Sequence, residues 1–132
     1  MTYYCTLKKE DNVYYVEFPD LPNVFTFGET KEKAIEMAGE ALNGVLESEI
    51  TRGIHIPLPS FISEYPVEVE PNIAFSLMLR KNRGKKTQNE IADKLNISYQ
   101  QYQQLENPKK ANPTLKTIAK LQKILDYKFV TF

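Results

Sequence analysis

The charged residues of this chain are divided by sign along the sequence, and this division limits the folds that the chain can adopt. Up to Glu70 there are 11 Glu and 2 Asp against 4 Lys and 1 Arg, a net charge of −8. From Pro71 onward there are 10 Lys and 2 Arg against 2 Glu and 2 Asp, a net charge of +8. A single core gives no reason for such sorting, whereas two domains that attract partners of opposite charge do. We therefore expect two domains, 1–70 and 71–132, the first binding a basic partner and the second binding nucleic acid.

The size and composition of the chain are typical of small globular domains. Domains of about 60 to 70 residues bury only roughly 60% of their unfolded surface, so we expect oligomerisation or a bound partner to stabilise them. An apolar content of 42% and a charged content of 26% are ordinary for globular protein. The single cysteine, Cys5, excludes an internal disulfide and indicates a reducing compartment. No signal-peptide pattern or long apolar run is present, so we expect a cytoplasmic protein without membrane contact.

The acidic half begins with the residue pattern of three strands. Residues 2–7 and 13–18 are rich in Tyr, Val and Phe, and Glu10-Asp11-Asn12 lies between them, which predicts a β-hairpin. A third short strand is predicted from Val24 to Phe27, where Gly28 ends it.

A long helix and a fourth strand follow. Thr30 can cap the helix, and Val67 to Val69 alternates as the final strand, so the predicted order is βββαβ. Glu70-Pro71-Asn72 is interpreted as a linker. The helix is expected to bury a stripe that consists of Ile35, Ala38, Leu42, Val45, Leu46 and Ile50.

A second face of this helix is acidic. Like charges four residues apart lower helix stability, so the face needs an explanation. It is either a solvated surface or a docking surface for a basic partner. The docking residues would be Glu32, Glu36, Glu40 and Glu47, with Asp20 nearby.

The acidic half offers no pattern for catalysis. Carboxylates can bind metal, and the fold could bring Glu17 and Asp20 near the helix, but no spaced cluster predicts a metal site. His55 is the only histidine and has no evident partner, so we interpret it as a structural loop residue. We therefore predict no enzyme activity, no catalytic residue, no metal and no cofactor.

Several separated segments of the acidic half resemble the HicB antitoxin family. The segments are Phe18-Pro19-Asp20-Leu21-Pro22-Asn23-Val24, then Thr26, Gly28-Glu29-Thr30, Glu32-Lys33-Ala34, Glu40-Ala41-Leu42 and Ile56-Pro57-Leu58-Pro59-Ser60. The resemblance covers about the first 70 residues and implies a partial ribonuclease H-like fold. It also implies that this domain binds and silences a small basic ribonuclease toxin, HicA.

The basic half has the residue pattern of four helices. The first begins at Asn72 and ends near Arg83-Gly84. Thr87, Ser98 and Thr114 can each cap one of the next three. These three are expected at Gln88 to Leu95, at Tyr99 to Asn107 with Pro108 as a stop, and after Thr114 with a stripe of Leu115, Ile118, Ala119, Leu121 and Leu125.

A helix, a short turn at Asn96 and a second helix, with small Ala92 at the crossing, predict a helix-turn-helix. The pattern resembles the Cro/repressor-like (Xre) class, and it consists of Thr87-Gln88-x-Glu90-Ile91-Ala92-x-Lys94-Leu95-x-Ile97-Ser98, Leu105-Glu106-Asn107 and Pro113. The whole chain is therefore expected to be α+β, with an all-α helix-turn-helix domain after the sheet domain.

Rotation about the third helix of this half predicts which side chains read DNA. If Tyr102 and Leu105 are buried, the opposite face is rich in glutamine, which pairs with the edge of adenine in the major groove. The expected base-reading residues are Tyr99, Gln100, Gln103, Gln104 and Asn107. The expected phosphate-binding residues are Lys85, Lys86, Gln88, Lys109 and Lys110.

The last seven residues are too apolar for a free tail. Tyr127, Phe129, Val130 and Phe132 either pack on the helical domain or pair two copies of the chain as an edge strand. A pair of copies would present two reading helices to a pseudo-palindromic site.

The two halves together predict an antitoxin that binds a HicA-like toxin and represses its own operon as a homodimer or higher homo-oligomer on double-stranded DNA. One alternative is a stand-alone repressor whose first domain serves dimerisation or ligand sensing. The other is a metal-dependent nuclease that uses the ribonuclease H-like domain.

Overall fold

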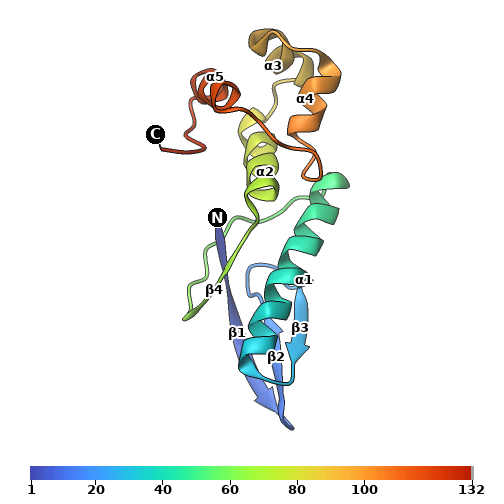
Figure 1. Cartoon of the computed structure of the whole chain (residues 1–132), viewed down its shortest axis with the longest axis vertical. Helices are drawn as coiled ribbons and strands as arrows, with labels where there is room; N and C mark the ends of the chain where they lie inside the picture. Colours follow the sequence, from blue (N-terminus) through green and yellow to red (C-terminus); the bar gives the residue numbers. More distant parts are fainter. Residues whose placement is uncertain (132) are drawn as a thin grey trace. The chain divides into compact units, whose positions relative to one another are not determined.

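The computed structural model describes residues 1–131 and divides into two compact units, Met1–Pro71 and a second that begins at Asn72 (Figure 1). The first unit has the predicted βββαβ order. Its strands form one antiparallel sheet in the order β3-β2-β1-β4. Its elements are β1 (Thr2–Glu10), β2 (Val13–Glu17), β3 (Phe25–Gly28), α1 (Lys31–Thr51) and β4 (Tyr65–Glu68).

The hairpin of β1 and β2 turns on two residues. Asp11 and Asn12 have φ angles of 48° and 64°, the left-handed pair that a two-residue hairpin turn requires. Because Glu10 pairs directly with Val13 across this turn, β1 extends three residues beyond the predicted end at Leu7. The long β1 is an inner strand that pairs with β2 on one side and with β4 on the other.

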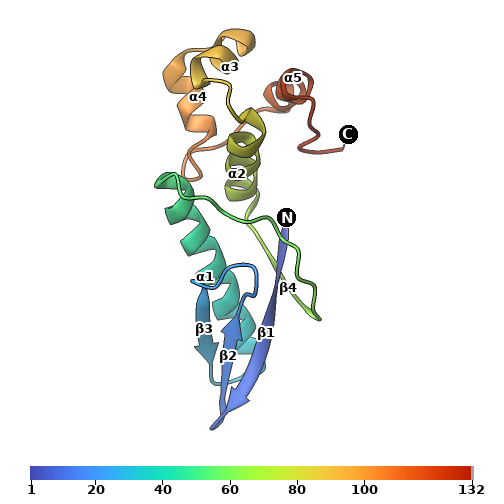
Figure 2. The same ribbon diagram turned by 180° about the vertical axis from the view of Figure 1, so that it is seen from behind.

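Helix α1 covers one face of the sheet, as the view from behind shows with the sheet in front of the helix (Figure 2). The Thr30 hydroxyl caps it by accepting from the Lys33 N–H at 3.0 Å. A Cβ on Gly28 would lie 2.4 Å from the Ala34 nitrogen, so strand and helix meet too closely for any side chain there. This close approach buries Ala34 in the first turns, and Ile35, predicted to be buried, is instead 36% exposed. The rest of the buried stripe is Ala38, Leu42, Leu46 and Ile50, with Val45 half-buried.

Two connecting segments add to the core of the first unit, the one between β2 and β3 and the one between α1 and β4. The first segment buries Phe18, Leu21 and Val24, and the second buries Ile56. The Tyr3 hydroxyl, from β1, donates to the Pro57 carbonyl at 2.6 Å, and burial raises the pKa of Tyr3 to about 12.

The second unit is all helical: α2 (Pro71–Arg83), α3 (Gln88–Leu95), α4 (Tyr99–Leu105) and α5 (Leu115–Leu125). The expected linker at Glu70-Pro71-Asn72 is wrong, because Pro71 opens α2, a position where its missing N–H costs nothing. Helix α4 ends at Leu105 rather than at Asn107, since its C-cap is Glu106. Leu115, predicted to be buried, is 67% exposed at the first position of α5.

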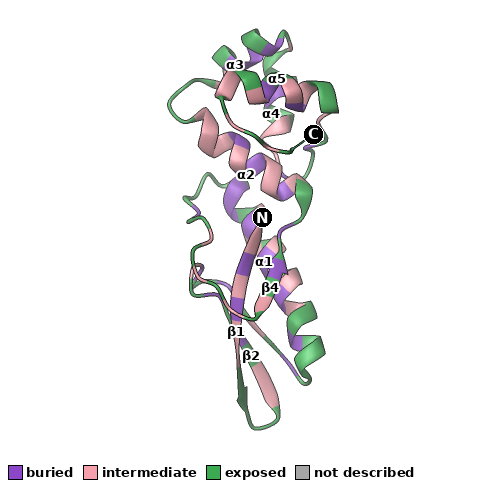
Figure 3. Ribbon diagram, turned by 90° about the vertical axis from the view of Figure 1, so that its left-hand side faces the viewer, coloured by how far each residue is buried: buried purple, intermediate pink, exposed green. Residues whose placement is uncertain are grey.

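One hydrophobic core holds the four helices together. Burial along the ribbon is visible in Figure 3, where the inward faces are purple. The core consists of Leu79, Ile91, Ala92, Leu95, Tyr102 and Leu121, with Phe75, Ile97, Leu105, Ile124, Leu125 and Phe129 packed against it.

The segment after α5 packs on this core. The Phe129 ring lies 5.2 Å from Phe75 and 5.0 Å from Tyr127, measured between centroids. The Val130 N–H donates to the Gln122 side chain at 3.0 Å. Residues 127–131 form no strand in the described chain, and Phe132 lies outside the described residues.

Candidate functional site

Helices α3 and α4 have the helix-turn-helix geometry that the sequence predicts. Thr87 and Ser98 each form a capping box with the residue three positions on, Glu90 and Gln101. Asn96, between the helices, adopts the left-handed conformation with φ 57°. The caps fix the first turn of each helix, and the left-handed residue reverses the chain between them.

The outward face of α4 carries three unpaired glutamines. Tyr102 is fully buried, and Leu105 is half-buried, so these two residues define the inner face of the helix. Gln100, Gln103 and Gln104 are exposed on the other side, and none of their side-chain amides has a hydrogen-bond partner within residues 1–131. Gln101 differs from them because its side chain accepts from the Ser98 N–H at 2.9 Å. The arrangement leaves three amides free to bond an external ligand.

The two other expected base-reading residues stand at the ends of this face. Tyr99 is 40% exposed at the first position of α4. Asn107 lies beyond the helix, and its side-chain oxygen accepts from the Lys109 N–H at 3.0 Å. The Asn107 side-chain oxygen is therefore already used by the local turn, whereas its amide NH₂ remains able to donate to a ligand.

The C-terminal end of α4 is fixed by a partly buried ion pair. Arg83 of α2 donates to Glu106 through Nε at 2.6 Å and through Nη2 at 3.1 Å. Gln88 donates to the same carboxylate at 3.2 Å. The hydrogen bonds to Glu106 raise the pKa of the Arg83 guanidinium. This contact joins three helices, and it gives the Gln88 side chain, expected at a phosphate, a partner inside the protein.

The lysines expected at phosphates are all exposed. Lys85 and Lys86 lie in the turn before α3, and Lys109 and Lys110 follow α4. The two pairs therefore precede and follow the helix-turn-helix in the chain. Lysine ammonium groups in such positions bind phosphate oxygens and carry no base specificity.

The acidic face of α1 points away from the sheet. Glu32, Glu36 and Glu40 are exposed, and Glu47 is half-buried. Lys33 pairs with Glu36 at 3.3 Å, which neutralises part of this charge. The remaining carboxylates keep the face acidic.

Asp20 has a role that the sequence interpretation missed. Its carboxylate accepts from the Ser60 N–H at 2.9 Å, the Ser60 hydroxyl at 2.8 Å and the Phe61 N–H at 3.0 Å. These bonds, led by the Ser60 N–H, lower the pKa of Asp20. The residue thus ties the loop after β2 to the segment after α1, 40 residues later. The segments that resemble the HicB family contain both Asp20 and Ser60, but their spacing does not show that the two side chains meet.

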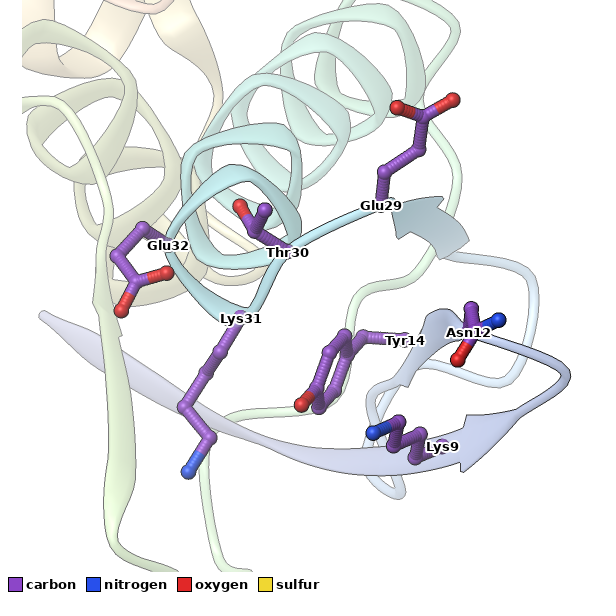
Figure 4. A pocket seen from close by; sticks show the side chains of 7 residues that line it. All are labelled: Lys9, Asn12, Tyr14, Glu29, Thr30, Lys31 and Glu32. Carbon is purple, nitrogen blue, oxygen red and sulfur yellow. The ribbon is translucent and has the colours of Figure 1, made fainter.

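A hollow of about 430 Å³ lies beside the start of α1 (Figure 4). Lys9, Tyr14 and Lys31 line it, together with Glu29 and Glu32, and Glu29 points away from the two lysines. Within residues 1–131 no group of three His, Cys, Asp or Glu side chains is placed to hold a metal ion. In the same residues no helix is long and apolar enough to cross a membrane.

These features define a class of protein in which a sheet-and-helix domain precedes a helix-turn-helix domain. The family described as HicB_like antitoxin of bacterial toxin-antitoxin system matches residues 2–77. The helix-turn-helix family matches residues 78–132. The chain belongs to the HicB-like antitoxin family, and both resemblances seen in the sequence are confirmed.

Two named relatives agree with this assignment. Antitoxin HicB 1 of Photorhabdus laumondii subsp. laumondii is 34% identical over 104 residues, which are 76% of this chain and 67% of the relative. Antitoxin HicB 2 of the same organism is 34% identical over 79 residues, 60% of this chain and 57% of the relative. The crystal structure of the N-terminal domain of Burkholderia pseudomallei antitoxin HicB shares 33% identity, with a TM-score of 0.43, and covers 47% of this chain and 74% of its own.

Proposed function

We propose that the protein neutralises a small, basic, HicA-like ribonuclease toxin and represses the operon that encodes both. The observation that carries the proposal is the joining of an acidic HicB-like domain to a helix-turn-helix with three unpaired glutamines on its outward face. Neutralisation and repression are both binding functions, so the proposal needs no catalytic residue. Because repression acts on the chromosome, we expect the protein in the bacterial cytoplasm.

The toxin arm of the proposal rests on charge. The net charge of −8 up to Glu70 attracts a cationic protein, and a field of one sign raises the rate of association. Asp20 would add to this field only at a distance, because its carboxylate is occupied by Ser60 and Phe61. The residues proposed to act on the toxin are Glu32, Glu36, Glu40 and Glu47.

The DNA arm rests on the outward face of α4. Gln100, Gln103 and Gln104 would bond base edges in the major groove, with Tyr99 and Asn107 at either end of the face. Each good bidentate pair is worth about 1–3 kcal/mol of discrimination. The phosphate contacts would come from Lys85, Lys86, Lys109, Lys110 and the main-chain N–H of Gln88.

A homo-oligomer would place two such faces on one operator. Helix-turn-helix proteins read two half-sites about one helical turn apart, and the two-fold axis of the dimer matches that of the site. We therefore propose a homodimer or a higher homo-oligomer as the DNA-binding form.

Two double variants and two assays test both arms together. Gln100→Ala with Gln104→Ala should weaken operator binding several-fold or more in a gel shift with the DNA upstream of the gene, and should leave toxin co-purification intact. Glu36→Lys with Glu40→Lys should weaken toxin co-purification and should leave operator binding intact. The bait for co-purification would be the short basic protein that this proposal expects to be encoded beside the gene.

The control for the charge reversal is Glu64→Lys, an exposed glutamate of the same unit that lies outside α1. It separates a local effect of the α1 face from the general loss of negative charge. Unchanged gel shifts for the glutamine variant would remove the assignment of α4, and unchanged co-purification for the glutamate variant would show that the α1 face is only solvated. Absence of any toxin binding by the wild-type chain would favour a stand-alone repressor.

A further inference from the structure

The face of the sheet turned away from α1 carries an aromatic patch that no other segment of the first unit covers. Phe25 and Phe27 of β3 are 71% and 57% exposed, and Tyr15 of β2 is 41% exposed. Tyr15 pairs with Phe27 across the two strands, with ring centroids 6.2 Å apart. We call these three side chains the aromatic patch.

The register explains why these rings face outward. Side chains alternate between the two faces of a strand, and Val16, fully buried against α1, pairs with Thr26. The neighbours of Val16 and Thr26 in each strand must therefore point to the opposite face. The aromatic patch is thus a fixed property of the sheet rather than a matter of side-chain rotation.

The position of the patch calls for a partner. Strand β3 is at the edge of the sheet, with β2 as its only neighbour. Proteins normally shield edge strands with charge or with short, polar sequence, and exposed aromatic clusters mark surfaces that bind. Aromatic side chains, Phe and Tyr included, are also enriched at the centres of protein interfaces.

The charges beside the patch indicate the chemistry of that partner. Glu17 pairs across the strands with Phe25, and Glu29 directly follows β3; neither has an ion pair within residues 1–131. Lys8, opposite Tyr15, is neutralised by Glu10 at 3.1 Å. A second copy of this unit would bring two net charges of −8 together, whereas a cationic protein would be attracted.

We infer that the aromatic patch is the anchoring surface for the cationic toxin, which would place apolar side chains on Phe25 and Phe27 and basic ones near Glu17. This inference rests on the proposed function. The α1 glutamates lie on the opposite side of the unit and therefore act on the toxin through their field. Removing rings from an interface centre raises the dissociation rate, and removing peripheral charge lowers the association rate.

The test uses the full chain and the purified basic protein encoded beside the gene. Phe25→Thr and Phe27→Thr keep the strand preference of β3 while removing its rings. Each is expected to weaken toxin binding about 30-fold or more, mainly by faster dissociation. The matched control is Ile62→Thr, which removes a 76% exposed apolar side chain from the same unit outside the sheet and should leave binding unchanged.

The outcomes separate this inference from the function on which it rests. If the wild-type chain binds the toxin and Phe25→Thr and Phe27→Thr do not weaken that binding, the inference is wrong and the proposed function stands. Failure of the wild-type chain to bind the toxin overturns both. If the two variants retain toxin binding but convert an oligomer to a monomer in sedimentation, the patch joins copies of this chain and the inference is wrong. Unfolding midpoints equal to wild type exclude misfolding, because the rings are exposed.

Discussion

Single residues hold together segments that the sequence pattern leaves unrelated. Asp20 and Ser60 are 40 positions apart, yet one carboxylate takes three hydrogen bonds from Ser60 and Phe61. Asp20 was expected to be a docking residue because it is acidic, and composition alone cannot separate a carboxylate that binds a partner from one that binds its own backbone. In the same way, nothing in the sequence showed that Gln88 and Arg83 share the carboxylate of Glu106.

Asp20 makes the stability of the first unit depend on acid pH. Its pKa is lowered in the folded state, so its stabilisation is present above the pKa of the unfolded chain and is lost as the pH falls through the folded value. We expect Asp20→Asn to lower the melting temperature at pH 7 and to reduce the fall in melting temperature between about pH 5 and pH 2. The measurement is thermal melting by circular dichroism across that range. If the melting temperatures of the variant and the wild type changed in parallel with pH, the Asp20 carboxylate would not contribute to the pH dependence of stability.

At the scale of elements, the sequence predicts what local rules control. Thr30, Thr87, Ser98 and Thr114 all cap the helices expected of them, because a hydroxyl before a helix acts within three residues. The prediction was wrong for Ile35 and Leu115, because helical spacing says which side chains share a face but not how far the covering element extends.

The exposed rings of Phe25 and Phe27 were also not foreseen. Their strand is only four residues long and was recognised by composition. Which side of the sheet a ring takes depends on pairing with a neighbouring strand, and that register is a non-local property.

The turn between α3 and α4 depends on one left-handed residue. Asn96 has φ 57°. This left-handed conformation costs most residues with a Cβ about 1–2 kcal/mol, whereas Gly, Asn and Asp adopt it more readily. We expect Asn96→Ala to lower the free energy of unfolding by about 1 kcal/mol and Asn96→Gly to leave it nearly unchanged.

The matched control is Asn89→Ala, which makes the same change at an exposed helical position of α3 and should be neutral or slightly stabilising. Urea unfolding measures all three. Equal losses at positions 89 and 96 would show that the left-handed turn is not what the asparagine provides.

At the scale of the whole molecule, the division of charge makes both proposed binding functions depend on salt. Each unit carries a net charge of magnitude 8, and both associations are expected to weaken as the ionic strength rises. For DNA the logarithm of affinity falls with a slope of about −0.9 for each phosphate neutralised. The two activities can therefore be separated by changing one unit at a time.

Lys85→Ala is the variant that tests this separation. It should reduce the salt slope of operator binding by about 1 and leave the salt dependence of toxin binding unchanged. Titrations by fluorescence anisotropy at several salt concentrations measure both slopes. Glu64→Lys is the complementary control, since it changes the charge of the first unit and should leave the DNA slope as it is. A DNA slope that Glu64→Lys changes as much as Lys85→Ala does would mean that the two units do not act separately.

The pairing of β1 with β4 also sets an order of events during translation. The Val69 N–H donates to the Met1 carbonyl at 2.9 Å, and the four strands of the sheet end at Glu68, so the sheet can form once residue 69 has left the ribosome. Domains fold as units while the chain is still growing, and every helix of the second unit is made later. Under the proposed function, a nascent chain would be able to capture toxin before it is able to occupy the operator.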